Sequence, residues 1–292
     1  IKVWFTAGMG FFTDAYDLFI IGIVLILLTG PYSVSFHINT IEASLLGSSA
    51  IVAAIFGQLL FGTIADRFGR KKVYGIEATI LAVGAILSAI STNFLELFIF
   101  RFILGLGIGG DYPVSATIMS EYSNTKDRGK LLALLFANQG IGSVTAVTVG
   151  ITSAVLLPPD LAWRVMLLFG AIPAIAVIYL RRKLPETPRY SLLVNNDKDT
   201  AKKAKEVVGG SQSINPVKVE KHPFKVFLKN YGNILFVTSS TWFLLDIAFY
   251  GTGIYSGPIV SNIISASTLT MKIFLAGVPF LVGFFGYFSA VA

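Results

Sequence analysis

The stretch GTIADRFGRKKVYGIEATILAV, residues 62–83, carries a short charged turn between two apolar runs. The run before the turn, Ala43–Ala65, and the run after it, Val73–Ile90, are each close to the roughly 20 residues that a helix needs to cross a bilayer. The turn holds four basic side chains, which is typical of a loop on the cytoplasmic face of a membrane. This stretch therefore predicts a hairpin of two membrane-spanning helices.

The rest of the chain repeats this pattern of apolar runs and polar turns. Hydrophobic residues make up 54% of the sequence and charged residues only 13%, whereas a soluble domain carries about 25% charged residues. There is no cysteine, so the chain can form neither a disulfide nor a cysteine-ligated metal site. The sequence predicts an all-α polytopic membrane protein, with further spans at Val3–Leu28, Phe94–Ser120, Leu131–Leu157, Trp163–Leu180, Ile234–Ser256 and Met271–Ala292.

The basic residues are distributed unevenly between the two sides of the predicted membrane. Of the 23 lysines and arginines, all but Arg101, Arg164 and Lys272 lie at the N-terminus or in alternate loops. This bias places the N-terminus and the long connector in the cytoplasm. The net charge of +7 is thus explained by topology, and no nucleic-acid partner is expected.

Six spans, a long polar connector and two more spans are typical of a transporter built from two six-helix bundles. We expect an N-terminal bundle over residues 1–182, a cytoplasmic linker over 183–229, and the first two helices of a second bundle over 230–292. On this interpretation the chain is a fragment of a longer protein. Within the linker, a weak lysine-rich helix is expected at Thr200–Val208.

Four aspartates lie deep inside predicted spans, where ionisable side chains are costly and by default mark a function. They are Asp14, Asp17, Asp111 and Asp246, from the first, fourth and seventh spans. Those spans occupy equivalent positions in an inverted-repeat transporter and would line its central cavity. The alternative for each aspartate is an ion pair or packing bond within the bundle.

Two glutamates within spans have a simpler interpretation. Glu77 and Glu96 lie near the expected membrane edges, where their carboxylates could reach the interface.

The residues around Asp111 are mostly small. Gly105 and Gly109 form a small-xxx-small pair that predicts close helix packing. Gly105, Gly107 and Gly110 also match GxGxxG, but no strand precedes them, so a dinucleotide-binding fold is excluded.

Other candidate chemistry is sparse. The amides of Asn138 and Gln139 in the fifth span could bind a polar ligand or a neighbouring helix. No histidine, cysteine or acidic spacing suits a metal, and no catalytic triad is present. We therefore expect neither a cofactor nor an enzyme.

Three motifs resemble those of one superfamily. The stretches GTIADRFGRKK (62–72), RFILGLGIGG (101–110) and PETPRY (185–190) resemble the loop, fourth-helix and post-sixth-helix motifs of the major facilitator superfamily. The resemblance implies that superfamily's fold, in which two six-helix bundles alternate access to a central site.

Three further stretches resemble the phosphate:proton symporters of fungi and plants: TDAYDLFIIG (13–22), GGDYPVSATIMSEY (109–122) and TWFLLDIAFYG (241–251). The chain has Val114 where that family usually has leucine, and 251–253 read Gly-Thr-Gly instead of a polar stretch. The family also places a lysine near phosphate in its tenth helix, beyond this chain. The resemblance implies a phosphate site lined by Tyr112, Phe136, Gln139, Trp242, Asp246 and Tyr250, and a proton path through Asp14, Asp17 and Asp111.

Such a site requires carboxylates to tolerate an anion. Burial favours the neutral form of a carboxylic acid, which can donate a hydrogen bond to a phosphate oxygen, whereas an ionised carboxylate only accepts. We hypothesise that Asp246 makes this switch and that the other three aspartates relay protons. Phosphate and protons would then bind cooperatively.

The charged turn suggests a second role at the cytoplasmic side. A gating cluster is expected from Asp66, Arg67, Glu121 and Arg128; the alternative is a topological anchor without a gating role.

The leading hypothesis is thus an importer of inorganic phosphate coupled to protons, spanning the plasma membrane. The alternatives are an organic-anion or aromatic-acid:proton symporter of the same superfamily and a phosphate sensor that does not transport. The sequence leaves the proton stoichiometry, the choice between protons and sodium, and the oligomeric state open.

Overall fold

The computed structural model describes residues 2–123, 127–193, 224–263 and 268–291, and in these ranges the regular structure is helical without strands. The predicted helix at Thr200–Val208 and most of the predicted linker lie outside the described residues. The helices are α1 (Lys2–Thr29), α2 (Thr40–Phe68), α3 (Arg70–Val73), α4 (Ile76–Ile90), α5 (Phe94–Tyr122), α6 (Arg128–Leu156), α7 (Pro159–Phe169), α8 (Ala171–Arg182), α9 (Pro188–Leu193), α11 (Phe224–Ile263) and α12 (Leu269–Ser289).

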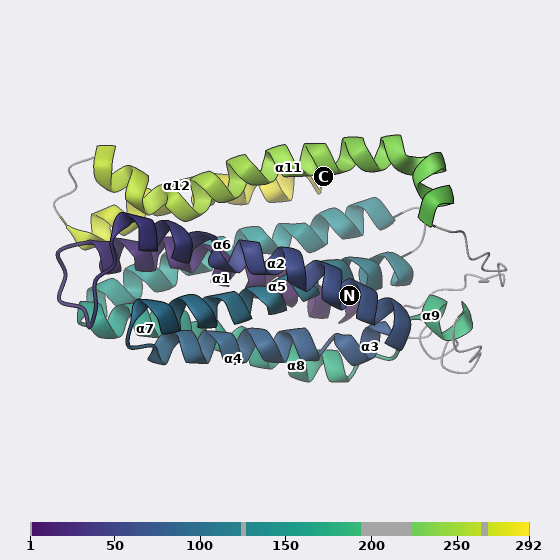
Figure 1. Ribbon diagram of the computed structural model, residues 1–292, viewed down its shortest axis with the longest axis horizontal. Helices are drawn as coiled ribbons and strands as arrows, with labels where there is room; N and C mark the ends of the chain where they lie inside the picture. Colours follow the sequence, from purple (N-terminus) through teal and green to yellow (C-terminus); the bar gives the residue numbers. More distant parts are fainter. Residues whose placement is uncertain (1, 124–126, 194–223, 264–267, 292) are drawn as a thin grey trace.

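Most helices run along the long axis of the molecule (Figure 1). Seven helical stretches of the described residues are long and apolar enough to cross a membrane, with α3–α4 and α7–α8 each forming one stretch. The remaining predicted span, Phe94–Ser120, corresponds to α5, which is not one of the seven. It is 29 residues long and packs between α2 and α4.

Helix α1 lies at the centre of the bundle. Apart from its two aspartates and a few other polar residues, apolar side chains surround this helix, which predicts a buried helix, and residues such as Phe19, Val24 and Leu27 are almost fully buried. It contacts α6 most extensively and also touches α5, α7, α8 and α11. Because neighbouring helices surround α1, its aspartates are buried inside the protein.

The predicted small-residue contact is confirmed. Gly105 and Gly109 of α5 lie directly on the backbone of Ala50 and Ala54 of α2, where an added Cβ would overlap the main chain. The absence of side chains allows the two helices to pack closely along their length.

Two predicted spans differ from the observed helices. The span Trp163–Leu180 is divided into α7 and α8 at Gly170, where an added Cβ would overlap the carboxylate of Asp17. The span predicted to begin at Ile234 instead begins at Phe224, within the predicted linker, and α11 is 40 residues long. Figure 1 shows α11 and α12 together on one side of the bundle, where they pack against α1 and α6.

Candidate functional site

Four polar side chains from four helices form a hydrogen-bonded group that we call the tyrosine–glutamine cluster: Tyr112, Gln139, Tyr250 and Tyr287. The amide nitrogen of Gln139 on α6 donates to the hydroxyl of Tyr112 on α5 over 2.5 Å. The hydroxyls of Tyr112 and Tyr250 lie 3.5 Å apart, and Tyr287 on α12 donates to the Gln139 amide oxygen over 3.3 Å. The cluster thus joins α5 and α6 to α11 and α12.

Aromatic rings form one wall beside this cluster. The ring of Phe136 lies 5.7 Å from that of Trp242 and 4.8 Å from that of Phe11, measured between centroids. Phe11 in turn lies 4.9 Å from the ring of Tyr112. Trp242 is half exposed, so the wall has an open edge on α11.

Asp246 lies on α11, one helical turn from both Trp242 and Tyr250. Its side chain is partly exposed and makes no hydrogen bond or ion pair within the part of the chain that the structure describes. It interacts electrostatically with the hydroxyl groups of Tyr250 and Tyr287. The structure therefore brings the six predicted substrate residues to one region, and adds Tyr287, which the sequence interpretation missed.

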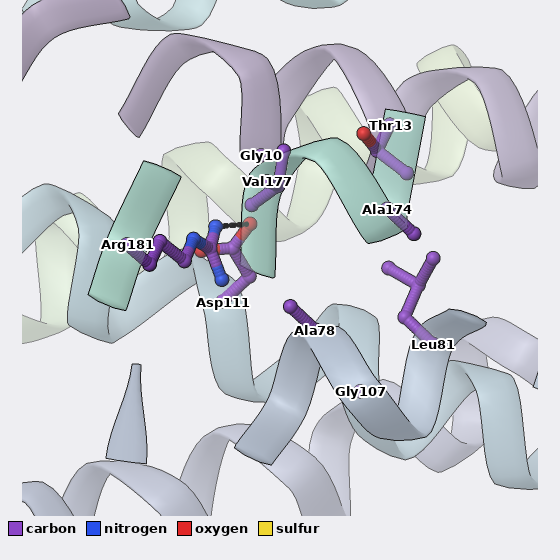
Figure 2. Close-up of a pocket in the computed structure, with 9 residues that line it drawn as sticks. All are labelled: Gly10, Thr13, Ala78, Leu81, Gly107, Asp111, Ala174, Val177 and Arg181. Atoms are coloured by element: carbon purple, nitrogen blue, oxygen red, sulfur yellow. Dashed lines mark hydrogen bonds and ion pairs between the residues drawn. The ribbon is translucent and has the colours of Figure 1, made fainter. Parts of the chain in front are cut away.

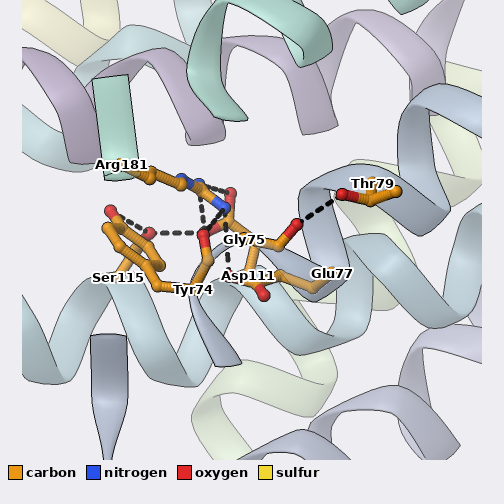
Figure 3. Close-up of polar contacts among 7 residues, drawn as sticks. All are labelled: Tyr74, Gly75, Glu77, Thr79, Asp111, Ser115 and Arg181. Atoms are coloured by element: carbon orange, nitrogen blue, oxygen red, sulfur yellow. Dashed lines mark hydrogen bonds and ion pairs between the residues drawn. The ribbon is translucent and has the colours of Figure 1, made fainter. Parts of the chain in front are cut away.

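A second polar group, which we call the Arg181 cluster, lies inside the bundle and consists of Tyr74, Glu77, Asp111, Ser115 and Arg181 (Figure 3). Nη2 of Arg181 lies 2.6 and 2.7 Å from the two carboxylate oxygens of Asp111, and Nη1 lies 3.0 Å from Glu77. The guanidinium stacks over the ring of Tyr74 at 4.0 Å, and the hydroxyl of Ser115 contacts both Asp111 and Tyr74.

This cluster corrects two interpretations. Glu77 was expected at the membrane interface, but it is fully buried and ion-paired. Arg181 was counted among the basic loop residues that follow the predicted span Trp163–Leu180, but α8 continues to Arg182 and turns Arg181 into the bundle, where it is 2% exposed. Gly10 of α1 makes this possible, because a Cβ there would overlap both Asp111 and Arg181.

The aspartates of α1 lie next to these charges. Both carboxylate oxygens of Asp14 are buried without a hydrogen-bond partner among the described residues, and the group interacts electrostatically with Asp111. Asp17 is equally buried; Nη2 of Arg101 donates to its backbone oxygen over 2.6 Å, while its carboxylate attracts the same guanidinium. The three aspartates of the predicted proton path are thus buried. Asp111 differs from the other two because it forms an ion pair with Arg181.

A small cavity lies between α1, α4, α5 and α8 beside the Asp111–Arg181 pair (Figure 2). It has room for about one water molecule. Both a carboxylate and a guanidinium border it, so a water there would have polar partners. The lining residues are Gly10, Thr13, Ala78, Leu81, Gly107, Asp111, Ala174, Val177 and Arg181.

The charged turn between α2 and α4 forms a different pairing from the one predicted. Arg70, and not Arg67, contacts Asp66 at 3.0 Å and Glu121 at 3.3 Å. Neither Arg67 nor Arg128 forms an ion pair with any described residue. Arg70 follows Asp66 by four residues, begins α3 and is partly buried, whereas the Arg67 side chain at the end of α2 is exposed.

The PETPRY segment is bound to this turn through its acidic and aromatic residues. The carboxylate of Glu186 accepts hydrogen bonds from the backbone nitrogens of Arg70 at 3.2 Å and Lys71 at 3.1 Å, at the start of α3. Gly69, with φ of 99°, brings the chain into this position. The hydroxyl of Tyr190 donates to the Arg67 carbonyl over 3.0 Å. The two sequence motifs therefore form one structural unit at this end of the bundle.

Comparison with known proteins gives matches along the chain. The family model described as "Sugar (and other) transporter" matches residues 3–291. An inorganic phosphate transporter 1-6 of Oryza sativa is 40% identical over 88% of this chain and 55% of its own length. A low affinity inorganic phosphate transporter 8 of Medicago truncatula is 41% identical over 84% of this chain and 52% of its own. The chain spans about half the length of the curated relatives it matches.

Two solved structures share the fold. The xylose transporter XylE from E. coli, in a partially occluded inward-open conformation, superposes with a TM-score of 0.76 at 19% identity, covering 97% of this chain and 68% of that one. A bacterial homologue of the human lysosomal transporter Spinster superposes with a TM-score of 0.72 at 18% identity, covering 97% and 60%.

Proposed function

Because this chain belongs to the sugar (and other) transporter family of the major facilitator superfamily, we propose that the protein imports inorganic phosphate together with protons. The family match confirms the expected fold and the expectation of a multi-pass membrane transporter, not an enzyme. The relatives named as inorganic phosphate transporters support the choice of substrate. The observation that carries the proposal is the tyrosine–glutamine cluster beside Asp246.

The chemistry of this region suits an oxyanion. The hydroxyls of Tyr112 and Tyr250, the amide of Gln139 and the indole N–H of Trp242 are hydrogen-bond donors. Phe136 and Trp242 provide an apolar side that lowers the local dielectric. A protonated Asp246 adds a further donor, whereas an ionised Asp246 repels the anion. Proton binding and phosphate binding at this site therefore favour each other.

The buried charges support the proton path. Asp14, Asp111 and Glu77 are three carboxylates, and Arg181 is the only guanidinium that contacts any of them among the described residues. Burying excess negative charge is costly unless it is neutralised. In our proposal this excess holds protons, and Asp14, Asp17, Asp111 and Glu77 pass them between the tyrosine–glutamine cluster and the end of the bundle near α9.

The proposed orientation places the N-terminus and the linker over 183–229 in the cytoplasm, and the proposed location is the plasma membrane. The distribution of basic residues supports this orientation. The linker separates the six-helix unit over 1–182 from α11 and α12, and phosphate would bind between these two parts of the chain.

The ion pairs of Arg70 are proposed to hold the cytoplasmic side closed. Replacing Arg70 with alanine is expected to slow transport by about tenfold, because it removes charge-assisted bonds to Asp66 and Glu121. The Kd for phosphate should stay unchanged. Lys72→Ala, which changes an exposed basic residue of the same turn, is the control. A loss of phosphate binding in Arg70→Ala would contradict the gating role.

The function itself is tested with the full-length protein in proteoliposomes. We expect a pH gradient, acidic outside, to drive uptake of labelled phosphate, and excess arsenate to block it. Benzoate should have no effect; competition by benzoate would instead support an aromatic-acid symporter. Phosphate binding without flux under any gradient would support a sensor and contradict transport.

A further inference from the structure

Tyr287 is the member of the tyrosine–glutamine cluster that no sequence motif singles out. Its ring on α12 packs over Gly140 of α6, where an added Cβ would come within 2.8 Å of the ring. Phe249 meets the same ring edge to face at 6.3 Å. The ring is therefore held between α6 and α11, and this leaves its hydroxyl directed at the amide oxygen of Gln139, 3.3 Å away.

This contact stabilises the orientation in which the amide nitrogen of Gln139 faces Tyr112. The two ends of a glutamine amide are similar in size, but the oxygen only accepts and the nitrogen only donates. The Tyr287 hydroxyl donates to the oxygen, so the nitrogen faces Tyr112. One N–H then binds the Tyr112 hydroxyl, and the second remains for a ligand.

We propose that Tyr287 is a positioning residue that orients the Gln139 amide so that the site presents donors, and thereby selects an oxyanion. This inference rests on the proposed function, because it assumes that phosphate binds beside Gln139. Without the Tyr287 hydroxyl, the amide can rotate and present its oxygen to the ligand. An amide oxygen repels phosphate oxygens but suits a ligand that carries hydroxyl donors.

The test uses the full-length transporter with Tyr287→Phe, which keeps the ring and removes the hydroxyl. The KM for phosphate is expected to rise about fivefold, the effect of losing one hydrogen bond, with kcat within about twofold of wild type. The matched control is Tyr255→Phe, which removes a hydroxyl of α11 that donates to Ser44 at 2.8 Å, outside the site. This variant should keep the wild-type KM.

A double-mutant cycle separates positioning from direct contact or simple structural support. In a Gln139→Ala background, adding Tyr287→Phe should leave KM unchanged, because Tyr287 acts through Gln139. Additive effects, a wild-type KM in Tyr287→Phe, or a Tyr287→Phe variant that does not fold would each overturn the inference. If the wild-type protein takes up no phosphate, the proposed function fails. If the wild-type protein takes up phosphate and Tyr287→Phe has the same KM, only this inference is contradicted.

Discussion

Replacing Arg181 with leucine should leave almost no folded, active transporter. Among the described residues, Arg181 is the only positively charged side chain that pairs with Asp111 and Glu77. The change removes it and leaves both carboxylates buried. Breaking a buried ion pair on one side costs about 3–5 kcal/mol of folding free energy, a large fraction of the stability of a typical protein. Thermal unfolding in detergent and phosphate uptake in proteoliposomes measure the two effects.

Two control variants make this prediction specific. Arg182→Leu changes the neighbouring exposed arginine and should leave both measurements near wild type. Combining Arg181→Leu with Asp111→Asn and Glu77→Gln removes the uncompensated charges, so the folded protein should return. We expect that triple variant to bind phosphate without coupling it to protons. An Arg181→Leu single variant as stable as wild type would show that the cluster does not support the fold.

Replacing Asp246 with asparagine should abolish proton-driven accumulation of phosphate while preserving phosphate binding. Asparagine keeps the size of the side chain and an N–H donor but cannot release a proton. In the wild-type protein, phosphate affinity should increase as the pH falls, by up to about tenfold per pH unit for one linked proton. In Asp246→Asn this part of the pH dependence should vanish.

Binding titrations across pH test this second prediction. Phosphate changes its own ionisation in the same pH range, but that change is common to both proteins and cancels in the ratio of their affinities. The ratio of wild-type to variant affinity should therefore fall as the pH rises. A ratio that stays constant with pH would exclude Asp246 as the linked group.

The sequence predicted those features that depend on local pattern. Long apolar runs identify the helices, and the spacing of Gly105 and Gly109 predicts the close contact of α5 with α2. Tyr112 and Tyr250 lie within recognisable motifs, and the family resemblance assigns Gln139 of the fifth span to the same site. The structure brings the three residues together.

The missed features depend on partners that are distant in the sequence. Arg181 stands in a run of three basic residues, and nothing in that run distinguishes the side chain that turns inward from the two that stay exposed. Its burial depends on Gly10, about 170 residues earlier, which leaves space on α1. Glu77 was placed at the interface for the same reason: its burial is stabilised by an ion pair with Arg181, which is distant in the sequence.

The choice of Arg67 instead of Arg70 has a similar cause. Both residues follow Asp66 within one helical turn, but only Arg70 is directed toward Glu121 and the ring of Tyr190. That direction is set by Gly69 and by the contact of Glu186 with the start of α3. Tyr287 was missed because a lone tyrosine near the end of an apolar helix carries no motif.

The central claim is that buried carboxylates carry the protons that move with phosphate, and proton movement is its most direct measure. Phosphate should be added to proteoliposomes that contain wild type, Asp246→Asn or Asp111→Asn, while a pH-sensitive dye records the internal pH. We predict internal acidification with wild-type protein and none with either variant, although Asp246→Asn still binds phosphate. Acidification at the wild-type rate in both variants would contradict the account.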